Sequence, residues 1–326
     1  MKAGFLLLLG IVAFFFVFFL FGLDFTMLFS VKDPLLLILG AISFTLATIV
    51  VAFRTRFFLK SSGEKYHGSY KLLEIELISK IFYYIAPGRF NIPAKAILLS
   101  SEFELSKKKA LSICMLEYVV DVTVMITLAI LGGFLFLQGV FFKISIQNIL
   151  ISVIIIFILA IAYFFVPLKI FKKIEKKINK IHSEKIRKLF SLFFKIAFNI
   201  REVWPEVLLK RRTISALFFV LLAWVFTGLS MELVFLAYGV YVPIFWVLTI
   251  SAFSVFIAGI SQIPGGVGAR ELSMVFLFVS LGVPQDLVVI AAVVTRIYTI
   301  IPIIIGYAFL IKSRKSLHFD IKSILK

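Results

Sequence analysis

Charged side chains are scarce in this sequence. Asp, Glu, Lys and Arg make up 16% of the 326 residues, whereas hydrophobic residues make up 62% and the mean hydropathy is +1.10. A water-soluble globule of 36.9 kDa built from this composition would have too few polar side chains to cover its surface. The composition therefore excludes a soluble enzyme and predicts an all-α polytopic integral membrane protein.

Cysteine and histidine are scarcer still. The single cysteine, Cys114, cannot form an intrachain disulfide or a thiolate metal site by itself. The three histidines, His67, His182 and His318, are too scattered to make a ligand cluster. We find no catalytic motif either, so we expect no enzyme activity, no catalytic residues, no metal and no cofactor.

Acidic residues are outnumbered by basic ones, 17 to 35, and the net charge is +18. Residues 169–212 alone contain 14 basic and 4 acidic residues between two apolar segments, which is typical of a cytoplasmic loop. Within it, isoleucines recur at helical spacing among lysines over 169–194, which predicts an amphipathic helix on the cytoplasmic leaflet or against the bundle; a regulatory partner site is the alternative. No nucleic-acid module accompanies the charge, so we predict contact with anionic lipid headgroups and no nucleic-acid partner.

Six apolar segments are long enough to cross a bilayer, at about 20 residues per crossing. They are residues 3–23, 34–53, 110–137, 146–166, 213–238 and 287–311. Basic residues should gather on the cytoplasmic side, and they flank these segments asymmetrically. The expected cytoplasmic groups are Arg54, Arg56, Lys60 and Lys65, then Lys107, Lys108 and Lys109, then Lys312, Arg314 and Lys315, against Lys32 and Lys143 opposite. We therefore place the protein in the cell membrane with both termini in the cytoplasm.

Two further apolar segments are interrupted. Residues 72–101 contain Pro87 and Gly88, and residues 244–281 contain Pro264, Gly265 and Gly266. Each break frees backbone polar groups, which are tolerated at membrane depth only inside protein or beside a water-filled cavity. We therefore predict two half-helices in each segment; the alternative is an ordinary kinked span.

The flanking charges give these broken segments opposite directions. Basic residues flank the first on both sides and the second on neither, so we expect the first to enter from the cytoplasm and the second from outside. The prediction is six full spans plus two re-entrant helical hairpins in an inverted-topology repeat, with a substrate site where the breaks meet. We treat residues 1–326 as one transmembrane domain, with halves at about 1–168 and 213–326 joined by the basic linker 169–212.

Ionisable residues inside apolar segments mark candidate sites, because each costs about 2.5–3.5 kcal/mol to insert at a helix centre. They are Arg89, Lys95, Glu117, Asp121, Glu232, Arg270, Glu271 and Arg296. Glu117 and Asp121 are four residues apart, so they share a helical face and can jointly receive an Arg or Lys from another element. Arg270 and Glu271 are adjacent and point in different directions, so we expect one of them to pair with a separate helix.

The second break also resembles an anion site. Gly265, Gly266 and Gly268 precede a new helix, whose N-terminus carries free backbone N–H groups and partial positive charge, and Arg270 follows. A phosphate or carboxylate would suit this end. The alternative is a tight glycine turn used only for packing.

These residues resemble the lysylphosphatidylglycerol synthase/flippase transmembrane region. The resemblance rests on IPGGVGARE (263–271), on Gly282-Val283-Pro284, and on Arg296 leading to Pro302 and Gly306. In the first half, PGRFNIPAKAILL (87–99) resembles the family element PGRxGExxRxxLL, and Glu117 to Asp121 resembles ERxxD. The chain departs from these patterns with Asn91 and Ile92 in place of Gly-Glu, Lys95 in place of the second Arg, and Tyr118 in place of the Arg of ERxxD.

The resemblance implies that the membrane region moves a lipid headgroup between leaflets, while a separate soluble domain makes the aminoacylated lipid. Few residues follow the last predicted span, so we expect a stand-alone membrane domain without the synthase activity. The predicted function is a flippase-like transporter for an anionic or polyprenyl-phosphate-linked headgroup.

In that function the intramembrane charged residues would have two roles. Arg89, Lys95, Arg270, Arg296 and the three glycines of the second break would bind the phosphate; Glu117, Asp121, Glu232 and Glu271 would hold the cations or carry coupled protons. Two alternatives stay open. One is a secondary transporter of a small soluble anion. The other is a membrane-embedded transferase that uses a lipid-linked donor, with Asp121 or Glu271 as base.

Overall fold

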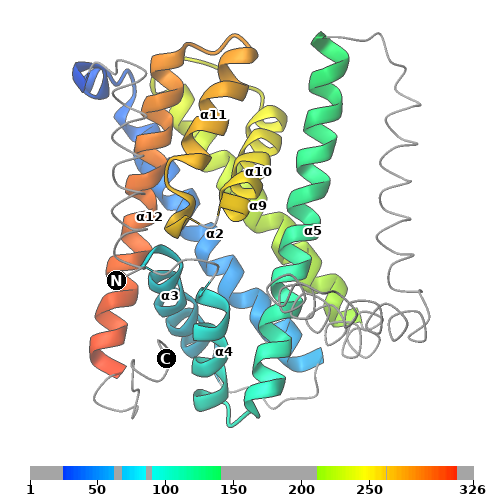
Figure 1. Ribbon diagram of the computed structural model, residues 1–326. Coiled ribbons are helices and arrows are strands. Elements are labelled where there is room, and N and C mark those ends of the chain that lie inside the picture. Colours follow the sequence, from blue (N-terminus) through cyan, green and yellow to red (C-terminus); the bar gives the residue numbers. More distant parts are fainter. Residues whose placement is uncertain (1–24, 62–67, 86–89, 141–210, 262, 314–326) are drawn as a thin grey trace, which may run out of the picture.

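The computed structural model describes residues 25–61, 68–85, 90–140, 211–261 and 263–313. Within these ranges the regular structure is entirely helical, as predicted (Figure 1). The elements are η1 (Phe25–Phe29), α2 (Pro34–Ser61), α3 (Ser69–Ile85), α4 (Asn91–Glu102), α5 (Lys107–Val140), α9 (Arg211–Ala237), α10 (Ile244–Ser261), η2 (Pro264–Gly266), α11 (Ala269–Ser280) and α12 (Gln285–Ser313).

Five of the described helices are long and apolar enough to cross a membrane. These candidate spans are Pro34–Lys60, Lys107–Gly133, Ser215–Ala237, Ile244–Ser261 and Gln285–Lys312. Four of them correspond to predicted spans, whereas the predicted spans 3–23 and 146–166 lie outside the described residues. The fifth is α10, which we predicted as half of an interrupted segment and which is long enough to cross by itself. The chain is therefore a multi-pass membrane protein.

The end of the second predicted span was wrong. We expected it to stop at residue 53, which placed Arg54 in the cytoplasmic flank, but α2 continues to Ser61. The helix continues because Phe57, Phe58 and Leu59 extend its apolar surface, and Phe58 is completely buried. Arg54 is only 3% exposed, because carboxylates of α5 neutralise its charge.

The interrupted segments form two pairs of short helices that approach each other from opposite ends of the molecule. Helices α3 and α4 lie in the half where α2 and α12 end, and α10 and α11 lie in the other half (Figure 1). The turn η2, between α10 and α11, contacts α3. Pro264 begins this turn, where the sequence predicted a break. Pro87 and Gly88, the predicted break between α3 and α4, lie outside the described residues.

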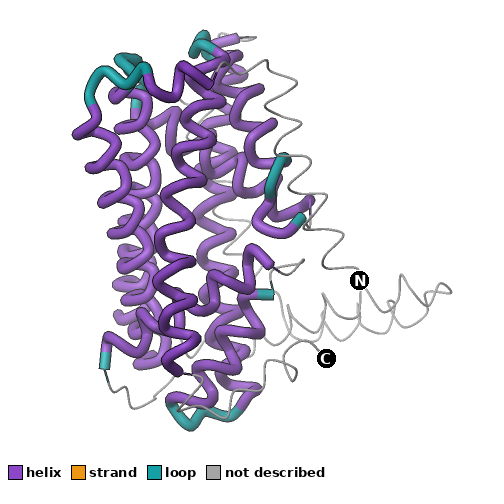
Figure 2. The backbone as a smooth tube through the Cα atoms, turned by 90° about the vertical axis from the view of Figure 1, so that its left-hand side faces the viewer, coloured by secondary structure: helices purple, strands orange, loops and turns teal. Residues whose placement is uncertain are grey.

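Each half of the molecule has its own apolar core. One is centred on Phe58, Leu99 and Ile113, from α2, α4 and α5. The other includes Phe235 and Phe278, whose rings meet edge to face at a centroid distance of 5.1 Å. Helices α2 and α9 pack against each other and run through both halves, and the long helices follow the height of the molecule (Figure 2). The turn η2, which contacts α3, lies near mid-height between the two ends of the molecule (Figure 1).

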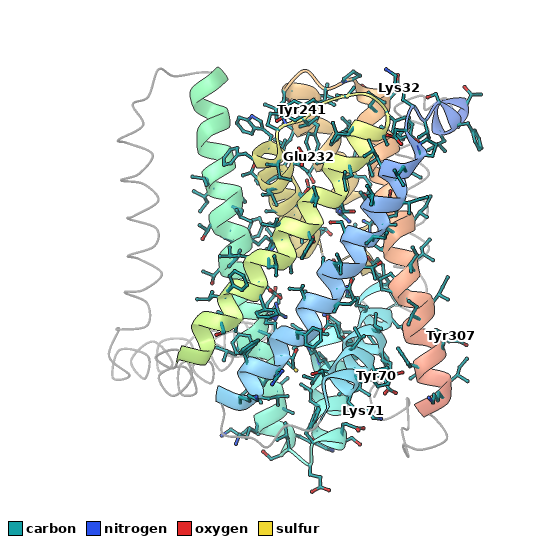
Figure 3. All side chains as sticks on the ribbon, turned by 180° about the vertical axis from the view of Figure 1, so that it is seen from behind. Lys32, Tyr70, Lys71, Glu232, Tyr241 and Tyr307 are labelled. Carbon is teal, nitrogen blue, oxygen red and sulfur yellow. The ribbon has the colours of Figure 1, made fainter. Side chains whose placement is uncertain are left out.

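The ends of the molecule differ in charge. Tyr70 and Lys71 lie at one end and Lys32 and Tyr241 at the other (Figure 3). Among the described residues at helix ends, Lys60, Lys71, Lys107, Lys108, Lys109 and Lys312 belong to the first end, whereas the second has Lys32. This is the asymmetry on which the predicted orientation depends; the orientation itself stays a prediction.

Candidate functional site

A buried ammonium group ties four helices together in the first half. Lys95 of α4 is 6% exposed, and its Nζ donates to Glu76 Oε2 at 2.7 Å, to Glu117 Oε2 at 2.7 Å and to Thr55 Oγ1 at 2.9 Å. An ammonium has three donors, so all of them are used. A charge in a dry interior is stable only when it is paired and hydrogen-bonded in this way. Lys95 therefore joins α2, α3, α4 and α5.

Arg54 of α2 completes this network. Its Nη1 donates to Asp121 Oδ1, and its Nη2 lies 3.6 Å from Glu117 Oε2. The two carboxylates of α5 thus share one cation from another helix, the arrangement indicated by their four-residue spacing. The sequence did not single out Arg54, because it follows the predicted span 34–53, or Glu76, although this residue lies inside the interrupted segment 72–101. The same spacing rule applied to 72–85 would have singled out Glu76 and Lys80.

The network lines one wall of a cavity of about 250 Å³. The other wall is apolar and includes Ala223, Trp224 and Val255 of α9 and α10. Within the described part of the chain, three buried polar atoms of lining residues have no hydrogen-bond partner: Arg54 Nε, Glu117 Oε1 and Asn91 Oδ1. Buried polar atoms are normally satisfied, so the cavity has unused capacity for a polar ligand or water.

A second ion pair organises the break in the other half. Arg296 Nε donates to Glu271 Oε1 at 2.6 Å, so α12 is tied to α11. The same guanidinium donates to the carbonyl oxygens of Gly265 at 2.9 Å and Gly266 at 3.4 Å. The other oxygen of Glu271 accepts the backbone N–H of Gly268 at 2.8 Å. The pair therefore satisfies the backbone groups that the break sets free.

The glycines of this turn have backbone conformations that favour glycine. The φ angles of Gly265, Gly266 and Gly268 are +64°, +61° and +85°. A Cβ on Gly265 would also collide with the ring of Tyr84 in α3, and one on Gly266 with Ala258 in α10. The turn thus brings η2 against α3. That these glycines bind substrate stays a prediction, since their described backbone hydrogen bonds go to Arg296, Glu271, Ile263 and Leu272.

Arg270 differs from the other predicted cations. Its side chain makes no hydrogen bond or ion pair with any described residue, and its Nε is buried. Its charge interacts electrostatically with Arg296 and Glu271 and, more weakly, with Tyr84 and Tyr83 of α3. Lys95 and Arg296, by contrast, have carboxylate partners, and Arg89 lies outside the described residues. Of the predicted cations that the structure describes, Arg270 is therefore the one that has no hydrogen-bond or ion-pair partner among the described side chains.

A smaller chamber of about 180 Å³ lies between the first pair of short helices and the long helices α2 and α12. Its lining residues include Lys80, Tyr83, Tyr84 and Asn91 from the first pair and Thr299 from α12. Glu76 and Asn91 line both this chamber and the larger cavity, so the two are neighbours.

Glu232 stands apart from these clusters. It lies on α9 in the half that contains α10 and makes no hydrogen bond or ion pair with a described residue (Figure 3). No hydrogen bond or ion pair in the described structure connects it with Glu117, Asp121 or Glu271. Those three carboxylates have cations or backbone N–H groups as partners. Its predicted part in coupling stays a prediction.

Sequence comparison connects this architecture with a known family. Residues 3–306 match the family described as the lysylphosphatidylglycerol synthase TM region. A UPF0104 membrane protein of Pyrococcus horikoshii is 30% identical over 155 residues, which are 46% of this chain and 44% of that protein. Another, of Methanothermobacter thermautotrophicus, is 40% identical over 77 residues, 24% of this chain and 23% of that protein.

The alignments thus span less than half the length of these curated relatives. No solved structure matches the chain significantly. The family match, by contrast, extends over nearly the whole sequence and includes both charge clusters and the glycine turn. The protein therefore belongs to the lysylphosphatidylglycerol synthase transmembrane-region family.

Proposed function

We propose that this protein is a flippase-like transporter, not an enzyme, that moves an anionic or phosphate-bearing lipid headgroup between the leaflets of the cell membrane. The observation that carries the proposal is the meeting of two pairs of short helices near mid-height, with η2 against α3 and buried charges on both sides. Discontinuous helices that meet near the midplane are the usual site of substrate binding in transporters. Membership of a lipid-related membrane family also supports a transporter of lipids.

The charges support an anionic headgroup. A phosphate crossing hydrocarbon needs cations that are not already neutralised by the protein. Lys95 and Arg296 are engaged by Glu76, Glu117 and Glu271, so they support the structure of the path. Arg270, without an ion-pair partner in the described ranges, is the cation that would neutralise a passing phosphate.

The larger cavity supports an amphipathic substrate. Charged residues of α2 to α5 form one wall, and apolar residues of α9 and α10 form the other. A lipid presents the same division, with a polar headgroup next to apolar chains. A small soluble anion would not need the apolar wall, so we favour a lipid over the soluble solute.

The proposed orientation follows from the charged ends. We assign the end that contains Lys60, Lys71, Lys107 and Lys312 to the cytoplasm, because basic residues favour that side. Helices α3 and α4 would then enter from the cytoplasm and α10 and α11 from outside, as the corresponding parts of an inverted-topology repeat. Both termini would lie in the cytoplasm.

Lipid movement in proteoliposomes tests the proposal. Fluorescent anionic phospholipids and a polyprenyl phosphate would be followed by quenching of the outer leaflet, with and without a proton gradient. We expect the protein to accelerate the movement of at least one phosphate-bearing lipid, and Arg270→Ala to reduce it at least about tenfold through loss of a charge-assisted contact. Lys71→Ala, at the charged end of α3, is the matched control and should keep the full rate.

Two results would contradict the flippase proposal. No acceleration for any of these lipids, with a protein that is folded and inserted, would refute a flippase. Uptake of radiolabelled phosphate or another soluble anion in the same vesicles would replace it with the solute transporter.

A further inference from the structure

We propose that the larger cavity, between the charged wall of α2 to α5 and the apolar wall of α9 and α10, binds an uncharged group with several hydroxyls, best matched by one sugar ring. As a binding site it stands on its own contacts, and no part of it depends on where a phosphate lies. Its use in selecting a lipid headgroup rests on the proposed function.

Arg54 has unused donors at this cavity. A guanidinium carries five N–H donors, and Arg54 makes one hydrogen bond with a described residue, from Nη1 to Asp121 Oδ1. Its Nη2 lies 3.6 Å from Glu117 Oε2, which is too far for a hydrogen bond, and its Nε is buried without a partner. A ligand that satisfies Arg54 therefore needs acceptor atoms.

The same cavity has unused acceptors. Glu117 is 3% exposed, and its Oε2 accepts from Lys95, but its Oε1 is buried without a partner in the described structure. The Oδ1 of Asn91 is in the same situation. Asp121, whose side chain is 40% exposed, meets Arg54 through one of its two oxygens. A ligand that satisfies these groups therefore needs donor atoms as well.

A hydroxyl meets both needs, because it is a donor and an acceptor at once. A fully ionised phosphate has acceptors only, and an ammonium has donors only. The charges at the cavity agree with this choice, since two cations, Arg54 and Lys95, face three carboxylates, Glu76, Glu117 and Asp121. An added anion would meet an excess of negative charge, and an added cation would leave the donors of Arg54 unused.

Size and shape favour a sugar ring among such groups. The cavity of about 250 Å³ is below the roughly 300–1,000 Å³ of pockets for drug-sized ligands, so it suits a single ring. Trp224 and Tyr118 also line it, and their flat apolar faces can pack against the C–H groups of a ring. The hydroxyls of the same ring would then reach the charged wall.

The departures from the family pattern gather at this cavity. Asn91, Ile92, Lys95 and Tyr118 stand where PGRxGExxRxxLL and ERxxD have Gly, Glu, Arg and Arg, and all four line it. Ile92 replaces a carboxylate and Tyr118 replaces a guanidinium. The cavity is therefore less charged than the family pattern would make it, which fits an uncharged ligand.

Binding to the purified protein, in a detergent that carries no sugar, tests this site without any leaflets. Four probes share the same short acyl chains and differ in the headgroup: a hexosyl diacylglycerol, the diacylglycerol itself, a phosphatidic acid and a phosphatidylethanolamine. Free methyl hexoside is the fifth probe, and each is titrated by calorimetry. We expect the hexosyl lipid to bind at least about tenfold more tightly than the other three lipids, through hydrogen bonds to charged groups.

Asn91→Leu separates binding from stability. It replaces an unsatisfied buried amide by an apolar side chain of similar size, so the melting temperature should stay the same or rise. The hexosyl lipid should nevertheless bind about tenfold more weakly, because a hydrogen-bonding group is lost. Ser230→Ala is the matched control and should bind like the unchanged protein, because Ser230 Oγ is also buried without a described partner but does not line the cavity.

The probes also distinguish the source of the sugar. Binding of free methyl hexoside would assign the site to a soluble sugar as well, and binding of the hexosyl lipid alone would assign it to a lipid headgroup; either supports the site if Asn91→Leu weakens it. No binding of a hexosyl probe would overturn the site. Equal or tighter binding of any lipid without the sugar, or unchanged binding by Asn91→Leu, would overturn it too.

The two proposals fail differently. If the hexosyl probe binds and Asn91→Leu weakens it, but no lipid moves in proteoliposomes, the sugar site stands and the flippase does not. If phosphate-bearing lipids move equally well with and without a sugar, and Asn91→Leu moves them at the full rate, the flippase stands and this site does not.

Discussion

At the scale of single residues, the buried cations of this protein divide into those that are satisfied and those that are not. Lys95 uses all three donors, and Arg296 bonds to a carboxylate and two carbonyls. Lys80 has one hydrogen bond, and Arg270 has none from its side chain to a described residue. The first group should therefore be needed for stability and the second for binding.

Arg296→Met should destabilise the protein strongly. Removing the guanidinium leaves Glu271, which is 1% exposed, as an unpaired buried charge and frees the carbonyls of Gly265 and Gly266. Breaking a buried pair in this way costs roughly 3–5 kcal/mol. Thermal unfolding in detergent measures the change, and Glu271→Gln in the same chain should restore part of it. A melting temperature unchanged by Arg296→Met would contradict the structural role.

The two carboxylates of α5 should differ in their effect on stability. Glu117 is 3% exposed and meets both Lys95 and Arg54, whereas the Asp121 side chain is 40% exposed and meets only Arg54. We expect Glu117→Gln to cost several kcal/mol and Asp121→Asn about 1 kcal/mol or less, because solvent screens the more exposed pair. The same unfolding assay compares them, and a larger loss for Asp121→Asn would reverse the assignment.

At the scale of elements, close packing positions the short helices. Gly306 of α12 lies against the backbone of α3, where an added Cβ would collide with the carbonyl group of Leu77. Small residues permit such close contact between membrane helices. The face of α3 that carries Lys80 is thereby held beside Thr299 and Pro302 of the same helix α12.

Gly306→Ala should therefore loosen this contact. We expect a loss of about 1–3 kcal/mol in the free energy of unfolding, as is typical of overpacking. Gly133→Ala in α5 is the control, since nothing lies within 4 Å of the added Cβ and alanine favours a helix. Equal effects of the two substitutions would show that the contact with α3 does not matter.

At the scale of the whole molecule, the charged ends predict the orientation in the membrane. Cys114 is 3% exposed, so cysteines introduced at the surface can be labelled against a low background. We expect a membrane-impermeant maleimide to label Tyr241→Cys on intact cells, because Tyr241 is 70% exposed at the end without the basic cluster. Lys108→Cys should react only after the membrane is opened. The opposite pattern would invert the proposed topology.

Much of the site followed from residue spacing. Glu117 and Asp121 indicated a shared cation, and Pro264 with its glycines indicated a break, because both patterns are local to one helix or turn. Which cation they receive is not local: Arg54 lies 67 positions before Asp121. Lys80 was missed for the same reason, since its lack of an ion pair with a described residue depends on Glu76 pairing with Lys95.

The sequence by itself determined that this is a multi-pass helical membrane protein of a particular family, because hydropathy, helix-breaking residues and motifs are properties of short stretches of chain. Only the tertiary structure decided which buried charges are neutralised and which remain free for a ligand. Pairing depends on distances of a few ångströms between helices that are far apart in sequence, and those distances are set by packing.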